Sequence, residues 1–220
     1  MSNARRLRIA SLFQTKGRNP YVPLLYDQLV QFGLERAGDA RLQLGWLWRA
    51  RHEVTFLNFS WGPDEYYVWK QLHGRPRRIL SWIRLSLFAG RLLTARMLGY
   101  RVVWMIHEVY PPHSGVGRRL DRSAGKVLAR ASHVLIAHDH AVAERARVEL
   151  GRAARKLEVV PHGSYDGVYP QGRHRAQVRE ELGVAPDSFV FLCFGSLRRD
   201  KAIELLTGSG ESKAPDQLEP

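Results

Sequence analysis

The chain has 220 residues, 45% of them hydrophobic, so it can bury a core and exceeds one average domain. Its single cysteine excludes a disulfide framework and a cysteine-based zinc site. A formal net charge of +13 favours anionic partners such as nucleotides, phospholipid headgroups or nucleic acid, although most of the basic residues are arginine, a bias that genomic base composition also produces.

Six short apolar runs predict the strands of a parallel sheet. They are rich in Val, Ile, Leu and Phe and do not alternate with polar residues, as is typical of strands buried on both faces. Segments with helical spacing separate them, so we expect an α/β fold with a Rossmann-like, doubly wound parallel sheet. The runs are Leu7–Phe13, Val54–Phe59, Val102–Ile106, Val134–Ala137, Leu157–Val160 and Phe189–Phe194.

The predicted helices carry recognisable start and stop signals. Asp139 precedes one helix as a candidate N-cap, and Gly99 and Gly151 follow helical runs as stop signals. The helical segments are 24–32, 76–98, 118–130, 141–150 and 177–182.

The helix predicted over residues 76–98 is apolar, but Arg77, Arg84 and Arg91 recur at seven-residue intervals. Seven residues are nearly two helical turns, so these arginines share one face. Such a helix can lie on an anionic membrane surface. The alternative, favoured here, is an ordinary helix that covers the sheet and solvates its arginines.

No secretory signal opens the chain, because the apolar stretch Ile9–Phe13 is too short, and no apolar run approaches the roughly 20 residues of a membrane span. We expect a cytoplasmic protein, with peripheral attachment at the inner membrane face as an option. The domain boundaries that we predict are a Rossmann-like domain over 1–165, a linker and helix over 166–186, the start of a second domain over 187–206, and a disordered tail over 207–220.

Candidate ligand-binding residues follow the first two predicted strands, where parallel α/β sheets bind ligands. Gly17 permits close backbone approach, and Lys16 and Asn19 stand beside it as candidates for binding a sugar or an acceptor. Trp61 can stack on a sugar ring. Alternatively, the first loop is an ordinary solvent loop and Trp61 covers the core. The loop lacks GxGxxG, and GxxxxGK[ST] and GxSxG are also absent, which disfavours dinucleotide-binding, P-loop and α/β-hydrolase enzymes.

Histidines end three further strands. His107 and His162 can hydrogen-bond to sugar hydroxyls or phosphate oxygens, although a buried structural role for His107 is equally open. His138 and His140 flank Asp139, but consecutive residues point in different directions, so we expect no metal site there.

A basic turn follows the last predicted strand. Gly195 is followed by Arg198 and Lys201 at the start of a predicted helix. Backbone amides and two cations in this position suit a diphosphate, and the alternative is a merely basic loop.

These motifs resemble glycosyltransferase family 4, whose GT-B fold has two Rossmann-like domains. Residues 159–163 (VVPHG) are similar to its interdomain turn, and residues 194–201 (FGSLRRDK) to the opening of its donor domain. Residues 102–113 and 131–144 resemble two segments of its acceptor domain, and the resemblance spans about residues 7–206.

The resemblance implies transfer of a sugar from a nucleotide diphosphate sugar to a glycan or lipid-linked acceptor, with retained anomeric configuration and without a metal or other cofactor. Arg198 and Lys201 would contact the donor phosphates, with the Gly17 loop nearby, and His107 would contact the transferred sugar or a phosphate. The chain departs from the family at Ala202 and Glu108 and lacks the paired-glutamate segment of the donor domain; Glu204 and Glu211 have its spacing but stand too early. We therefore expect a truncated relative with a second Rossmann-like domain that is begun and not completed, weakly active or inactive alone.

Two other functions remain open. The chain can be a non-catalytic module that binds a glycan, a lipid headgroup or a partner chain. Nucleic-acid binding fits the net charge, but the arginines are spread along the chain and no nucleic-acid motif occurs, so we expect no nucleic-acid partner.

Overall fold

The computed structural model describes residues 7–12, 20–60, 62, 74–110, 117–170 and 172–192. The chain divides into two compact units, Met1–Gly163 and Ser164–Pro220. The first unit contains a six-stranded parallel sheet with the strand order β2-β1-β3-β4-β5-β6. The strands are β1 (Leu7–Ser11), β2 (Leu34–Asp39), β3 (Phe56–Phe59), β4 (Arg101–Ile106), β5 (Val134–Ala137) and β6 (Leu157–Val159).

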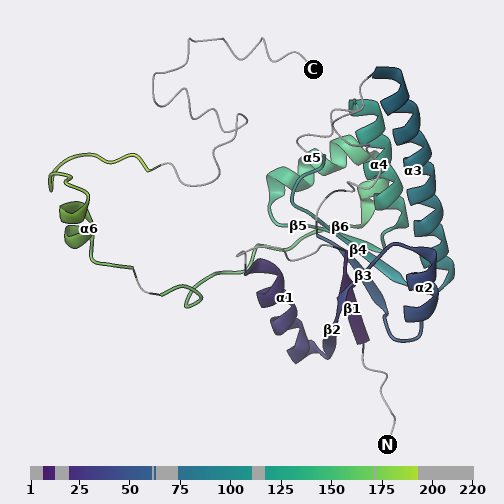
Figure 1. Ribbon diagram of the computed structural model, residues 1–220, viewed down its shortest axis with the longest axis horizontal. Coiled ribbons are helices and arrows are strands. Elements are labelled where there is room, and N and C mark those ends of the chain that lie inside the picture. The colour runs from purple at the N-terminus through teal and green to yellow at the C-terminus, as the bar shows by residue number, and fades with distance from the viewer. Residues whose placement is uncertain are drawn as a thin grey trace, which may run out of the picture. The chain divides into compact units, whose positions relative to one another are not determined.

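Helices connect successive strands and cover the sheet. Helices α2, α3, α4 and α5 pack side by side in that order, and Figure 1 shows α1 on the other side of the sheet. The predicted α/β class and Rossmann-like parallel sheet are confirmed. The helices of this unit are α1 (Tyr21–Leu29), η1 (Val30–Phe32), α2 (Leu44–Ala50), α3 (Gly74–Met97), α4 (Arg118–Ala131), α5 (His140–Leu150) and η2 (Gly151–Lys156).

The core lies between the sheet and the layer of α2 to α5. Trp104 of β4 is completely buried, as are Leu128 of α4 and Leu135 of β5. Helix α4 also carries Gly125, where an added Cβ would lie 3.1 Å from Leu150 Cδ2, so this glycine permits close packing against α5. Asp139 caps α5 as predicted, since its Oδ1 accepts a 2.7 Å hydrogen bond from the Val142 amide.

Two regular elements, β2 and α2, have no counterpart in the sequence-based prediction. The β2 sequence, LERAGD, is polar because this strand lies at the edge of the sheet and none of its residues is buried. Helix α2 is only seven residues long, with Leu47 its one buried residue, so its periodicity is too short to detect.

The predicted strand Phe189–Phe194 is wrong over its described part. Residues 189–192 form no strand, and Phe189, Phe191 and Leu192 are more than four-fifths exposed. A strand needs a neighbour for its backbone hydrogen bonds, and the described residues provide none here. The second unit contributes one helix, α6 (Arg175–Glu181), close to the predicted segment 177–182. The second Rossmann-like domain therefore remains a prediction.

Helix α3 is a single 24-residue helix, as the apolar segment predicted. Arg77, Arg84 and Arg91 are half-buried and not fully solvated, because they border the face that packs on the core. The expected solvated arginine stripe is therefore wrong, and apolar side chains occupy much of the outer surface of α3. No helix among the described residues is long and apolar enough to cross a membrane.

Candidate functional site

The register of the sheet brings three strand ends to one level. Ile106 pairs with Ala137, and Ala137 pairs with Val159. The next residues, His107 and His138, therefore leave β4 and β5 side by side at the carboxyl edge of the sheet. After β6, the Val160 amide still donates a 2.9 Å hydrogen bond to the Ala137 carbonyl, which holds the chain beside β5 as it approaches His162.

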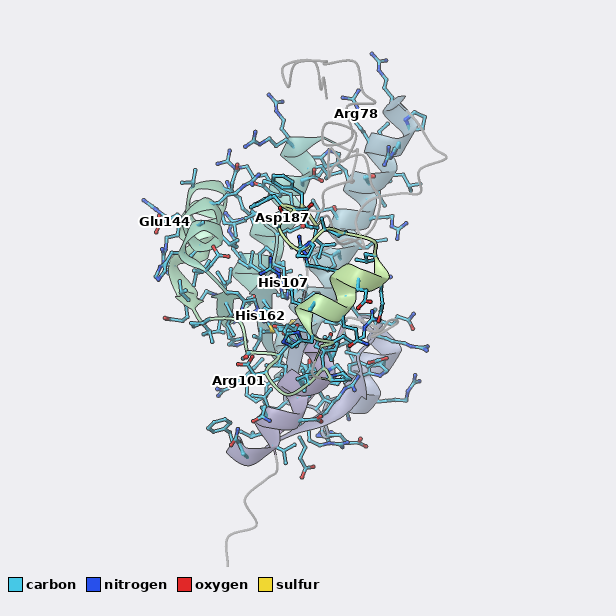
Figure 2. The ribbon with its side chains drawn as sticks, turned by 90° about the vertical axis from the view of Figure 1, so that its left-hand side faces the viewer. Arg78, Arg101, His107, Glu144, His162 and Asp187 are labelled. Carbon is cyan, nitrogen blue, oxygen red and sulfur yellow. The ribbon has the colours of Figure 1, made fainter. Side chains whose placement is uncertain are left out.

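The three histidine rings consequently form a cluster. The ring centroids of His107 and His138 are 4.9 Å apart, those of His138 and His162 are 5.0 Å apart, and those of His107 and His162 are 6.5 Å apart. His107 and His138 are partly buried, whereas His162 is exposed. Figure 2 labels His107 and His162, whose side chains lie together although the two residues are 55 positions apart in the sequence.

Tyr21, the first residue of α1, completes this group. Because α1 follows β1 in the chain, its N-terminus also lies at the carboxyl edge of the sheet. The Tyr21 side chain is buried, with its ring centroid 5.2 Å from that of His107, 5.8 Å from that of His138 and 4.6 Å from that of His162. We refer to Tyr21, His107, His138 and His162 as the Tyr–His cluster.

Hydrogen bonds fix the orientation of His138 within the cluster. Its Nδ1 lies 2.9 Å from the Val160 carbonyl oxygen, so Nδ1 carries the proton and donates it. In the neutral ring Nε2 then accepts from the Tyr21 hydroxyl at 2.9 Å. His162 Nδ1 lies 3.0 Å from the Gly163 carbonyl oxygen, which leaves Nε2 of that ring as the acceptor in its neutral form. The donor and acceptor nitrogens of the neutral His138 and His162 rings are therefore defined by these hydrogen bonds.

His107 is held neutral by its surroundings. Burial, and then the nearby His138 and His162, lower its pKa to about 4. A neutral imidazole offers one N–H donor and one lone-pair acceptor, which suits a sugar hydroxyl or a phosphate oxygen. A pKa this low makes His107 a weak base at neutral pH, so the environment favours hydrogen bonding over general-base catalysis.

The cluster does not have the arrangement of a metal centre. Within the described ranges, no group of three or more His, Cys, Asp or Glu side chains is placed to hold a metal ion. His140 is exposed at the start of α5 and Asp139 caps that helix, so the two neighbours of His138 in sequence take no part in the cluster. This divergence is the one expected of consecutive residues.

Of the residues proposed from the sequence, His107 and His162 lie together in the cluster. Lys16, Gly17, Asn19, Trp61, Arg198 and Lys201 lie outside the described residues, so their expected roles remain predictions.

Sequence reasoning missed Tyr21 and did not include His138 among the site residues. A signal existed for both. His138 ends β5 just as His107 ends β4, and Tyr21 opens the helix that follows the first strand. Both positions lie at the carboxyl edge in a fold of this type.

Comparison with known proteins shows a likeness in fold but not in sequence. No protein-family model matches the chain, and no curated protein matches its sequence. Among solved structures, Alr3699/HepE of Anabaena, in complex with UDP and glucose, is similar at 14% identity with a TM-score of 0.46. The match covers 80% of this chain and 50% of the HepE chain, so this chain spans about half the length of that protein.

Proposed function

We propose that this chain carries the acceptor-side domain of a glycosyltransferase of the GT-B type. The observation that carries the proposal is the Tyr–His cluster, which gathers polar ring nitrogens at the carboxyl edge of a Rossmann-like sheet. Ligands bind outside this edge in open α/β sheets. The VVPHG and FGSLRRDK motifs resemble those of glycosyltransferase family 4, and this resemblance supports a sugar nucleotide as the ligand class.

The proposed reaction transfers a sugar from a nucleotide diphosphate sugar to a glycan or lipid-linked acceptor with retained anomeric configuration. His107, neutral at physiological pH, would hydrogen-bond to the transferred sugar or to a phosphate oxygen. Tyr21 and the Val160 carbonyl would hold the His138 ring in place beside His107. His162 would stand at the exposed rim, where an acceptor enters.

The donor phosphates would be held by Arg198 and Lys201 in the basic turn. Two cations there would neutralise the charge that grows on the leaving diphosphate in the transition state. The Gly17 loop, with Lys16 and Asn19, would approach the donor and acceptor from the first strand, and Trp61 would stack on a sugar. These assignments rest on sequence position and on the family resemblance.

Isothermal titration calorimetry with UDP and GDP tests the proposal directly. We expect one of the two nucleotides to bind, and an Arg198→Ala/Lys201→Ala double substitution to weaken binding by about tenfold or more. Where His107 contacts the transferred sugar, His107→Ala should weaken binding of the matching nucleotide sugar more than that of the free nucleotide. Where it contacts a phosphate oxygen, His107→Ala should weaken binding of both. His140→Ala, which alters an exposed histidine outside the cluster, is the matched control.

A second assay separates a transferase from a binding module. Release of UDP or GDP from a panel of hexose nucleotides, with and without oligosaccharide acceptors, would support an active enzyme. Nucleotide binding without release would leave a donor-binding module, and absence of binding to either nucleotide would contradict the proposed function.

A further inference from the structure

Helix α3 exposes an apolar surface on the side that faces away from the core. Its buried residues, among them Leu85, Phe88 and Leu92, pack toward the sheet. Six large apolar side chains on the remaining surface are between 46% and 71% exposed. These residues, defined here as the α3 apolar face, are Ile79, Trp82, Ile83, Leu87, Leu93 and Met97.

The residues of the α3 apolar face form two groups along the helix, one before and one after Gly90. Ile79, Ile83 and Leu87 follow one another at four-residue intervals, as do Leu93 and Met97. At 1.5 Å per residue the face extends over about 27 Å. Isolated exposed apolar side chains are ordinary on proteins, but six of them along one helix indicate an interaction surface.

The charges that helix α3 itself carries are all of one sign. Helix α3 contains six arginines and no acidic residue between Gly74 and Met97. Arg75 and Arg78 are exposed in its first turns, and Figure 2 shows Arg78 at one end of the helix. Arg77, Arg84 and Arg91 are half-buried along one flank. The neighbouring α4 adds a further basic surface, with Asp121 as its only acidic residue.

We propose that the α3 apolar face docks on the surface of a bilayer that contains anionic lipids. A bilayer supplies an apolar phase for Ile79, Ile83 and Leu87 together with negative headgroups for the arginines on either side. Arginine stems can lie along the apolar phase while their guanidinium groups reach the headgroups. A second copy of this chain fits less well, because pairing two α3 faces brings arginine against arginine.

Docking in this mode is independent of the proposed sugar transfer, because no residue of the Tyr–His cluster belongs to α3. The two inferences can therefore fail separately. A chain that binds vesicles and no nucleotide would retain the docking surface, and a chain that binds nucleotide and no vesicles would retain the site.

Vesicle flotation with the full chain provides the test. We expect the chain to float with vesicles of phosphatidylcholine containing about 30% phosphatidylglycerol, and to bind phosphatidylcholine vesicles several-fold more weakly. An Ile83→Glu/Leu87→Glu double substitution should lower the partition coefficient by about tenfold or more, because each buried aliphatic side chain contributes that much to transfer. Phe32→Glu/Val148→Glu is the matched control, since both residues are more than 70% exposed and lie outside α3.

A second variant tests the charges. Arg75→Gln/Arg78→Gln should weaken binding to anionic vesicles by roughly fivefold per arginine and reduce its dependence on salt, while binding to neutral vesicles stays the same. Circular dichroism and the urea midpoint of every variant establish that the fold is intact.

Three outcomes would overturn the proposal. The first is that the wild-type chain does not float with anionic vesicles. The second is equal loss of binding in the Phe32→Glu/Val148→Glu control. The third is an oligomer, seen by analytical ultracentrifugation, that the Ile83→Glu/Leu87→Glu substitution dissociates while vesicle binding is unchanged, which would make the α3 apolar face a contact between protein chains.

Discussion

Three imidazole rings lie at the carboxyl edge with their centroids 4.9 to 6.5 Å apart, and this proximity has an electrostatic consequence. Protonating one ring disfavours protonation of its neighbours, and burial adds to this effect at His107. His107 is therefore neutral at physiological pH, which is also the state in which its ring can both donate to and accept from a polyhydroxyl ligand.

The depressed pKa of His107 predicts an acid-sensitive stability. Its pKa falls from 6.5 to about 4 in the folded chain, so between these values the unfolded chain binds more protons and acidification favours unfolding. The contribution is fully present above pH 6.5 and is lost as the pH falls to about 4. His107→Gln should remove a pH-dependent part of stability on the order of 2 kcal/mol.

Urea unfolding of wild type and His107→Gln between about pH 7 and pH 4 measures this difference. The wild-type chain should lose more stability over the range than the variant does. His140→Gln, at an exposed histidine, should keep the wild-type slope. Parallel slopes for wild type and His107→Gln would contradict the assignment of a neutral His107.

Glu149 is a nearly buried carboxylate that joins three segments. Its Oε2 accepts the Tyr110 hydroxyl at 2.8 Å, and its Oε1 accepts from Arg118 at 2.5 Å. Its backbone carbonyl accepts from Arg122 Nε at 2.9 Å. The hydrogen bond from Tyr110, followed by that from Arg118, lowers the pKa of Glu149. This carboxylate therefore stabilises the fold above its unfolded pKa of about 4.5, and the stabilisation is lost as the pH falls through the folded value.

Glu149→Gln should cost about 1 kcal/mol at neutral pH, because the amide oxygen can still accept from Tyr110 but the charge opposite Arg118 is lost. The difference from wild type should shrink at about pH 3, where the wild-type carboxyl becomes protonated. Glu144→Gln, which alters an exposed ion pair within α5, should be close to neutral at both pH values. A cost that does not change with pH would show that the effect is one of packing.

At the scale of elements, two glycines in helices offer a matched test of packing. Gly90 in α3 has nothing within 4 Å of an added Cβ, whereas at Gly125 in α4 the added Cβ lies 3.1 Å from Leu150 Cδ2. Gly90→Ala should stabilise the chain by about 0.5–1 kcal/mol through helix propensity alone. Gly125→Ala should be less stable than Gly90→Ala by about 1 kcal/mol, because Leu150 is completely enclosed and must shift.

Thermal and urea unfolding of the two variants beside wild type decide the order. Equal gains in stability at both positions would mean that α4 and α5 have room to separate. The close approach at Gly125 would then not require a glycine.

The sequence predicts correctly those strands and helices whose own residues are apolar where the element is buried. β4 and β5 read as continuous Val, Ile, Leu and Trp runs because helices cover the centre of the sheet. The sequence does not predict β2, because an edge strand can be polar. The pairing of β2 depends on β1 and not on its own composition. The apolar residues 189–192 form no strand despite their composition, since apolar residues form a strand only when a neighbouring strand is available to pair with.

Some residues of the candidate site are predictable from the sequence and others are not. His107 and His162 follow recognisable strands, so their position at one edge is predictable. The role of Tyr21 depends on where α1 begins. The apolar periodicity of the sequence does not define that point, because the helix starts at Tyr21, ahead of the apolar repeat. The orientation of His138 depends on a carbonyl 22 residues away, at Val160, and local sequence carries no sign of that contact.

At the scale of the whole molecule, the buried core belongs to the first unit alone. All buried hydrophobic residues of the described chain lie between Ile9 and Leu157, and no described residue from 164 to 192 is buried. Stability follows the apolar area removed from water, so the described residues beyond Gly163 are expected to contribute little to the unfolding free energy.

A chain ending at Gly163 should therefore fold by itself, with a cooperative urea transition whose midpoint matches that of the full chain within error. The fragment retains the sheet, the Tyr–His cluster and α3, so it should also retain vesicle binding, while nucleotide binding should be lost together with Arg198 and Lys201. The denaturant slope adds a second criterion, because it scales with the surface exposed on unfolding. A markedly lower midpoint for the fragment would mean that residues 164–220 stabilise the first unit, and the division of the chain after Gly163 would then not be one of independent folding.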